Sequence, residues 1–183
     1  GTPVTPAPPP TPTPTVAASA TATPVPSDTR TPATQKEVEV KPEPVKLAPG
    51  AVVPVSLELA GRYFAVVPTT LRDDTWAYLP DPGRISWLAG SYVNVVLGLP
   101  YTAENLDLVT ATLALSDTLT LRSSVGGANT YQVVERGTAS VYEIEALSQR
   151  RAGLTLVLLG GNEESPDRRI VVWAVPIEER DEE

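Results

Sequence analysis

The sequence predicts an all-β fold, either a barrel or a sandwich with short helical turns, preceded by an extended Pro/Thr-rich stalk. Three observations support this prediction. From about Val52, short runs rich in Val, Leu, Thr and Tyr recur between Gly- and Pro-containing turns, which is typical of barrels and sandwiches. Helical periodicity is scarce between these runs. The composition also changes near Lys36, where a segment unable to form a core gives way to a globular mixture.

Residues 1–35 consist almost entirely of Thr, Pro, Ala, Ser and Val. Proline fixes φ and removes a backbone donor, which favours an extended polyproline II conformation. Thirty-odd residues at about 3.1 Å each would reach on the order of 100 Å. Dense Thr and Ser beside Pro also suit O-glycosylation, for which Thr11, Thr13 and Thr15 are candidates. We expect this segment to be a spacer, either glycosylated or unmodified.

Residues 36–50 are expected to connect the stalk to the domain, and they begin with a strand-like pattern. Valines alternate with charged residues until prolines interrupt the alternation. Alternation favours a half-buried strand, and the prolines favour a place at a sheet edge. Such a strand can pair within its own chain or with a neighbouring copy, by β-augmentation. The candidate assembly residues are Lys36, Glu37, Val38, Glu39, Val40 and Lys41.

The barrel domain is expected over residues 51–177, followed by an acidic tail at 178–183. Short helices or helical turns are expected within 105–115 and 141–150. Two strand candidates, VNVVL and LTLVLL, are apolar on both faces, so we place them centrally in the sheet. The full set of strand candidates is VVPVSLEL, AVVP, SYVNVVLGL, TLTLRS, TYQVVERG, GLTLVLLG and RRIVVWAVPI.

Several functional classes are excluded or disfavoured by composition. The chain contains no Cys and no His, which excludes Cys-His and Ser-His nucleophilic pairs, histidine general bases and the usual zinc or copper sites. We therefore expect no metal and no cofactor. The net charge is −8, and five acidic residues and one Arg in the tail supply −4 of it. Without a basic stripe, nucleic acid is not an expected partner.

No apolar run is long enough to cross a bilayer, so we expect no membrane span in this chain. The first residue is Gly1 and not Met. We expect that an export signal or anchor was removed or lies outside this sequence. The missing methionine also fits an exposed or oxidising setting, because it removes an oxidisable sulfur.

The remaining polar and aromatic groups have a structural interpretation beside each functional one. Adjacent acids in a strand or loop usually point different ways into solvent, and no base or phosphate loop accompanies them here. The loop NEESPD has oxygens for calcium but lacks a glycine-centred spacing, which favours a solvated turn. The aromatic residues favour a barrel core over a ligand groove. The acidic pairs are Asp73 and Asp74, Glu143 and Glu145, and Glu163 and Glu164; the aromatics are Trp76, Trp87, Trp173, Tyr78, Tyr92 and Tyr101.

Taken in order, several segments resemble the sortase family, the cell-surface transpeptidases with a small closed β-barrel. TWAYLPDPGRISWLAGS resembles a family segment through its Pro, Trp and Gly, and LALSDTLTL resembles another through Asp117. NVVLGL resembles the strand that ordinarily ends in Gly-His, and places Leu99 at the histidine position. LTLVLL resembles the strand that ends in the reactive cysteine, and places Leu159 there. RRIVVWAVPI resembles the strand that begins with the family's arginine, so Arg168 or Arg169 would correspond to it.

The resemblance therefore implies a closed or partly closed sortase-like β-barrel. It also implies that the barrel is inactive, since sortase chemistry needs a thiolate, a proton-carrying imidazole and an arginine for the oxyanion. For both arginines we favour a solvent-facing structural role. We expect the chain not to be an enzyme. Leu159→Cys with Leu99→His is expected to rebuild part of a site if the arginine is well placed.

The expected function is that of an extracellular, cell-surface structural subunit of a filament or surface assembly. It would assemble with copies of itself through its N-terminal segment, with possible glycans on the stalk. The alternative is a stalk-tethered cell-surface pseudoenzyme domain that binds an extended peptide or glycan.

Overall fold

The computed structural model of this chain describes residues 1, 36–39, 44–72, 75–140, 148–161, 164 and 166–177. The chain divides into residues 1–30 and 31–183, and Gly1 is the described residue of the first unit. The predicted stalk, its glycosylation candidates Thr11, Thr13 and Thr15, and the acidic tail lie outside the described residues. They stay predictions.

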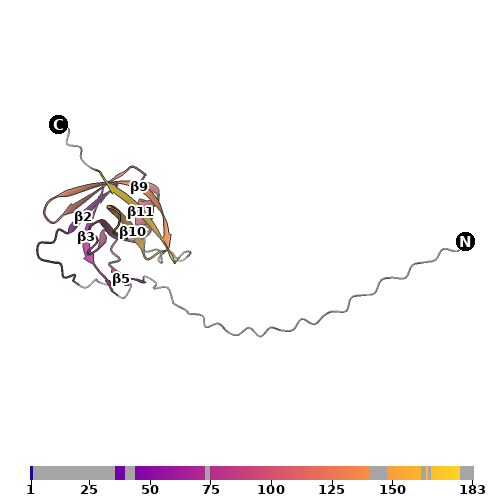
Figure 1. Ribbon diagram of the computed structural model, residues 1–183, viewed down its shortest axis with the longest axis horizontal. Coiled ribbons are helices and arrows are strands. Elements are labelled where there is room, and N and C mark those ends of the chain that lie inside the picture. The colour runs from indigo at the N-terminus through magenta and orange to yellow at the C-terminus, as the bar shows by residue number, and fades with distance from the viewer. Residues whose placement is uncertain are drawn as a thin grey trace, which may run out of the picture. The chain divides into compact units, whose positions relative to one another are not determined.

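Eight strands close into a barrel in the order β10-β11-β9-β8-β2-β3-β6-β7 (Figure 1). The pairs β3·β6 and β7·β10 are parallel, and the other neighbouring pairs are antiparallel. The predicted all-β closed barrel is confirmed. Its strands are β2 (Pro54–Leu59), β3 (Arg62–Thr69), β6 (Arg84–Leu88), β7 (Asn94–Pro100), β8 (Thr118–Ser123), β9 (Ala128–Ser140), β10 (Gly153–Leu159) and β11 (Arg168–Pro176).

Strands β7 and β10 are buried at every position, as their apolar sequences predict. Each pleated strand presents alternate side chains to opposite faces, so a strand covered on both sides needs apolar residues throughout. The inner faces fill the barrel, and the outer faces belong to a second apolar cluster. This outer cluster consists of Trp76, Tyr78, Val96, Ala139, Val157, Leu159 and Val171, with Leu88 and Trp173 packed against it.

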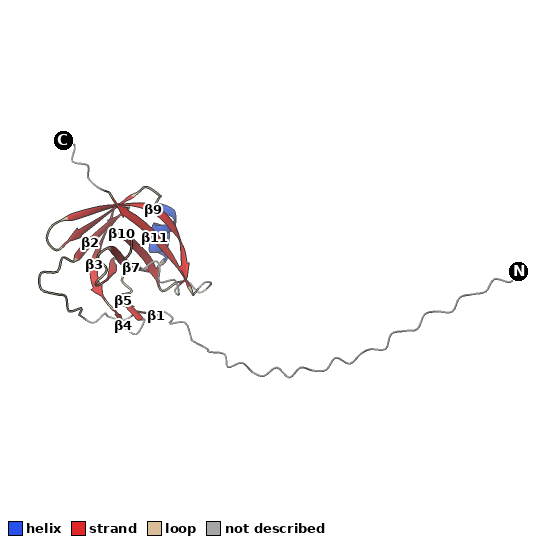
Figure 2. Cartoon of the chain, viewed as in Figure 1, coloured by secondary structure: helices blue, strands red, loops and turns tan. Residues whose placement is uncertain are grey.

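A separate three-stranded sheet has the order β1-β5-β4 and contains β1 (Lys36–Glu39), β4 (Leu71–Arg72) and β5 (Thr75–Tyr78) (Figure 2). Strand β1 pairs in parallel with β5 of its own chain, with Val38 opposite Ala77. The predicted strand is thus confirmed over Lys36–Glu39, where it pairs within the chain. Val40 and Lys41 lie outside the described residues.

The predicted helical segment near 105–115 forms α1 (Ala103–Asp107) and a π-helical turn, η1 (Leu108–Thr112). The Thr102 hydroxyl accepts the N–H of Asn105 at 3.1 Å and caps α1. Arg136 of β9 donates to the carbonyls of Val109 and Thr110 at 3.0 and 3.1 Å, which satisfies acceptors at the helical end. In the other predicted helical segment, residues 148–150 are not helical, and 141–147 lie outside the description.

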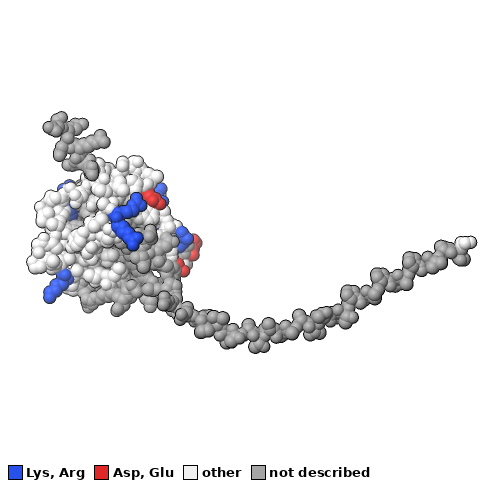
Figure 3. Space-filling view, viewed as in Figure 1, with Lys and Arg blue, Asp and Glu red and all other residues white. Residues whose placement is uncertain are grey.

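Three strands were not among the sequence candidates: β4, β5 and β6. All three are short, and β5 and β6 flank the Pro- and Asp-containing turn at 80–83, whose turn residues dominate the local pattern. No described helix is long and apolar enough to cross a membrane. On the face in Figure 3, the described basic side chains lie in small separate groups, some beside acidic side chains.

Candidate functional site

The structure brings the positions of Leu99 and Leu159 onto neighbouring strands. Leu99 of β7 pairs with Leu158 of β10, and Leu159 pairs with Pro100. Both leucines are fully buried. Leu99 and Leu158 pack in the barrel interior, whereas Leu159 packs in the outer cluster. The two side chains therefore point to opposite faces of the sheet, and the substitution pair proposed from sequence would not place a thiol and an imidazole on one face.

Leu159 is covered by aromatic side chains of β5. Trp76 and Tyr78 are 1% and 3% exposed and belong to the same outer cluster as Leu159. The Trp76 indole N–H donates to the Thr69 hydroxyl at 2.8 Å, and that hydroxyl donates to the Trp87 carbonyl at 3.1 Å. These bonds satisfy the polar groups that Trp76 and Thr69 bury. The place that the resemblance gives to a nucleophile is thus a packed apolar contact.

Gly98 leaves room for the contact between Leu159 and the Trp76 ring. A Cβ built on Gly98 would lie 2.9 Å from Leu159 Cγ and 3.0 Å from Trp76 Cζ2, which is closer than side chains pack. Gly98 shares the outer face with Leu159, and it leaves the space that the leucine and the indole fill. Strand β5 therefore covers this part of the outer face through the Trp76 side chain.

The two candidate arginines differ in position. Arg169 lies against Gly161, where an added Cβ would come 3.1 Å from its Cζ, and its Nη1 donates to the Pro166 and Arg168 carbonyls at 2.6 and 3.0 Å. Arg168 is exposed and donates to the Thr138 hydroxyl at 2.8 Å. Arg169 is thus the arginine beside the end of β10. Arg168 has the solvent-facing structural role that the sequence favours.

The described part of the chain offers little other chemistry. It contains no group of three or more Asp, Glu, Cys or His residues able to hold a metal. Burial raises the pKa of Tyr131 above its ordinary value, and a hydrogen bond with Glu58 is the main cause of the raised pKa of Tyr63. Both hydroxyls therefore stay protonated at neutral pH and offer no phenolate.

The acidic pairs predicted to be solvated are mostly untested. Glu164 is exposed, as expected. Asp73, Asp74, Glu143, Glu145 and Glu163 lie outside the described residues, as do parts of the NEESPD loop.

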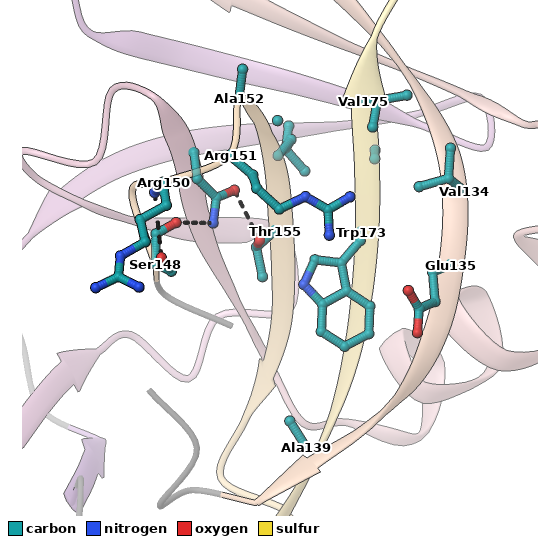
Figure 4. Close-up of a pocket in the computed structure, with 14 residues that line it drawn as sticks. Val134, Glu135, Ala139, Ser148, Arg150, Arg151, Ala152, Thr155, Trp173 and Val175 are labelled. Atoms are coloured by element: carbon teal, nitrogen blue, oxygen red, sulfur yellow. Dashed lines mark hydrogen bonds between the residues drawn. The ribbon is translucent and has the colours of Figure 1, made fainter. Parts of the chain in front are cut away.

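The aromatic residues largely fill the core, as predicted. Trp76, Trp87 and Tyr78 are buried, Tyr101 packs against the interior cluster, and Tyr92 is 57% exposed. Trp173 differs, because it is only partly buried and borders a pocket of about 440 Å³ at the opposite end of β10 from Leu159 (Figure 4). Sequence reasoning missed this pocket, although the adjacent arginines at 150 and 151 were a visible signal of it.

Comparisons with known proteins identify the fold. No protein-family model and no curated protein matches the sequence. Solved sortase structures do match the structure. Sortase A of Listeria monocytogenes is similar with a TM-score of 0.54 and 16% identity, over 69% of this chain and 88% of that chain.

Two further sortases give the same result. Sortase C of Streptococcus pneumoniae has a TM-score of 0.51 and 14% identity, over 68% of each chain. Sortase D5 of Clostridium perfringens has a TM-score of 0.50 and 13% identity, over 67% of this chain and 77% of that chain. At such identities the similarity concerns the fold. This chain is therefore a closed eight-stranded β-barrel with a sortase-like fold.

Proposed function

We propose that this chain is a non-catalytic extracellular structural subunit of a filament or surface assembly, which joins copies of itself through its N-terminal segment. The observation that carries the non-catalytic part is the burial of Leu159 beneath Trp76. A leucine offers no lone pair for attack on a carbonyl, and the whole sequence contains no thiol or imidazole to replace it. The Pro/Thr-rich segment at 1–35 supports a surface location.

The surviving arginine does not restore a reaction. Arg169 donates to the backbone carbonyls of Pro166 and Arg168, so its guanidinium supports the loop between β10 and β11. An oxyanion stabiliser lowers a barrier only where a nucleophile creates the oxyanion. A structural role for Arg169 does not depend on a nucleophile.

We expect no transpeptidation by the pure protein. The test incubates it with peptides resembling sorting signals and an amine acceptor, and follows the joined product by mass spectrometry. Heat-denatured protein is the control. Turnover above that control would show that another group performs the chemistry and that the chain is an enzyme.

The filled outer face also favours a structural subunit over the alternative, a tethered domain that binds an extended peptide or glycan there. A ligand at Leu159 would have to displace Trp76 and Tyr78, both nearly fully buried. Exposing a large aromatic side chain costs about 1.5–3 kcal/mol through its apolar surface alone. The alternative would therefore need another binding surface.

Strand β1 is the proposed connection between copies. It covers one edge of β5 by backbone pairing, and residues 40–53 link it to β2. A linker of this length spans up to about 45 Å when extended, so the same strand can pair with β5 of a neighbour. If two copies exchange β1, each β5 still pairs with a β1 strand. Such an exchange generates either closed dimers or open chains. Open chains would form the filament.

Cysteine cross-linking tests this connection directly, because the chain has no native cysteine. Chains with Val38→Cys are mixed with chains with Ala77→Cys, at positions that are register partners in β1 and β5. A short dimaleimide is then added. If β1 is exchanged, the mixture gives a covalent heterodimer, whose yield rises with protein concentration. The matched control replaces Ala77→Cys by Val125→Cys, at an exposed turn position.

Sedimentation gives the second readout. The full chain is expected to form oligomers, and a chain lacking residues 1–46 is expected to be a folded monomer. A link formed only within a Val38→Cys/Ala77→Cys double variant, together with a monomeric full chain at high concentration, would contradict the assembly. Polymerisation of the truncated chain would also contradict it. The tethered binding domain would then be the better interpretation.

A further inference from the structure

The pocket beside Trp173 is formed by four strands, β7, β9, β10 and β11, and by the loop before β10. It has a volume of about 440 Å³, within the range of small-molecule sites. Strand β9 contributes Val134 and Glu135, β11 contributes Trp173, and the loop before β10 contributes Arg150 and Arg151 (Figure 4).

The loop that carries the arginines is anchored to the barrel by hydrogen bonds. The Gln149 side chain accepts the N–H groups of Val93 and Asn94 at 3.1 and 3.2 Å and donates to the Asn94 carbonyl at 2.7 Å. Asn94 donates in turn to the Ser148 carbonyl at 3.1 Å. These bonds hold the loop at Ser148 and Gln149 against Val93 and Asn94. The two arginines follow directly in the sequence, so their backbone starts from a fixed point.

The floor of the pocket is polar, but its polar side chains hydrogen-bond to each other. The Thr155 hydroxyl is fully buried and donates to Asn94 Oδ1 at 2.9 Å. A ligand above this floor would therefore depend on the walls for its specific contacts.

One wall is shaped by a β-bulge. The pairing of β11 with β9 shifts between Trp173, which faces Glu135, and Ala174, which faces Val133. Val134 is the extra residue, and it is 45% exposed while Val133 is buried in the interior. In a regular strand successive side chains would point to opposite faces, but a bulge redirects one of them. As a result both Val134 and Glu135 line the pocket.

The charged and aromatic groups of the walls are available to a ligand. Arg150 and Arg151 are exposed, and neither has an ion-pair partner in the described part of the chain. The Trp173 indole N–H likewise has no hydrogen-bond partner among the described residues. Figure 4 shows the Arg151 side chain reaching toward the Trp173 indole, with Glu135 on the other side of the ring.

We propose that this pocket binds a carboxylate-bearing saccharide. The two guanidinium groups suit a carboxylate, to which they donate charge-assisted hydrogen bonds. The Trp173 indole offers a flat apolar surface to the carbon face of a sugar ring, and its N–H can donate to a ring substituent. The Glu135 carboxylate can accept hydrogen bonds from hydroxyl groups but repels a second negative charge. An acidic sugar can therefore contact both guanidinium groups, the indole and the Glu135 carboxylate.

The proposal goes beyond self-assembly, because the pocket shares no residue with β1 or β5. It gives the subunit an acidic polysaccharide as a second partner. The fluorescence of Trp173 can report on it, since Trp76 and Trp87 are 1% and 0% exposed and Trp173 is the most exposed of the three tryptophans.

The experiment titrates the full chain with α-1,4-linked digalacturonic acid and, as control, with the uncharged digalactose of the same linkage. Fluorescence and calorimetry follow binding. We expect saturable binding of the acid, weakened by added salt, and binding of the neutral sugar that is at least about tenfold weaker. Absence of saturable binding, or equal binding of both sugars, would overturn the proposal.

Variants assign the contacts. Arg150→Gln and Arg151→Gln are each expected to weaken binding of the acid about tenfold, because each removes a charge-assisted hydrogen bond. Arg122→Gln removes an equal charge on β8 and is expected to leave the affinity unchanged. Equal weakening by all three variants would indicate a diffuse charge effect and overturn the site. If tetraglutamate binds as tightly as the acidic sugar, the ligand is an acidic peptide and the saccharide assignment is overturned. The same conclusion follows if removal of residues 178–183 changes the Trp173 fluorescence.

Discussion

A cysteine introduced by Leu159→Cys is expected to react with iodoacetamide about a hundredfold more slowly than a cysteine at an exposed turn. Leu159 is fully buried beneath Trp76, so the thiol becomes accessible only when β5 opens locally. An opening free energy of about 3 kcal/mol lowers the rate by roughly a hundredfold. Apolar surroundings also raise the pKa of a thiol and reduce the reactive thiolate.

The comparison is simple because the chain has no native cysteine and each variant carries one reactive group. Val125→Cys, at a position 70% exposed, is the matched control. Adding Trp76→Ala to Leu159→Cys is expected to accelerate alkylation at least about tenfold, because the cover is removed. If Leu159→Cys alone reacts as fast as Val125→Cys, then the position is open and the proposed non-catalytic role loses its structural support.

Leu99→His gives a further comparison. Its side chain would enter the barrel interior, whereas the thiol would lie in the outer cluster. We therefore expect Leu99→His to leave the alkylation rate of Leu159→Cys unchanged, in contrast to the rebuilt site expected from the sequence.

Sequence patterns predicted the central strands of the barrel for a physical reason. NVVLGL and LTLVLL are apolar at successive positions, and only a strand covered on both faces accommodates that pattern. The order of segments then predicted the sortase-like fold, and this prediction is confirmed. The absence of Cys and His is a property of composition and needed no structure.

The cover over Leu159 could not be predicted in the same way. TWAY is a four-residue strand beside a turn-forming segment, and its own pattern does not say what it covers. Its position depends on Gly98, which is distant in sequence and leaves space for the Trp76 ring. Contacts of this kind arise from tertiary packing, which local patterns do not encode.

The choice between Arg168 and Arg169 was open for a related reason. The strand that follows them, β11, is apolar on both faces near its middle, so its sequence does not indicate which alternate positions face the barrel. Pairing with β9 and β10 decides this, and it places Arg169 beside Gly161. The same pairing creates the bulge that shapes the Trp173 pocket, and a bulge has no signal in the sequence of one strand.

Gly98→Ala is expected to lower the free energy of unfolding by about 1–3 kcal/mol. The added methyl group would lie 2.9 Å from Leu159 Cγ and 3.0 Å from Trp76 Cζ2, so the leucine, the indole or the β7 backbone must move. Urea denaturation of both proteins measures the difference. The control is Gly127→Ala, because a Cβ there has only an ordinary contact, at 3.5 Å from the Ser123 hydroxyl oxygen.

A double-mutant cycle then tests whether the cost arises at Leu159. Leu159→Ala alone is expected to cost about 2–5 kcal/mol, because it leaves a cavity beneath Trp76. In the double variant the alanine at position 98 fills part of the space that the leucine leaves. The combined loss should therefore be smaller than the sum of the two single losses, by about 1–2 kcal/mol. Strict additivity, or a neutral Gly98→Ala, would mean that the outer face is not packed as the structure shows, and that a ligand can reach Leu159.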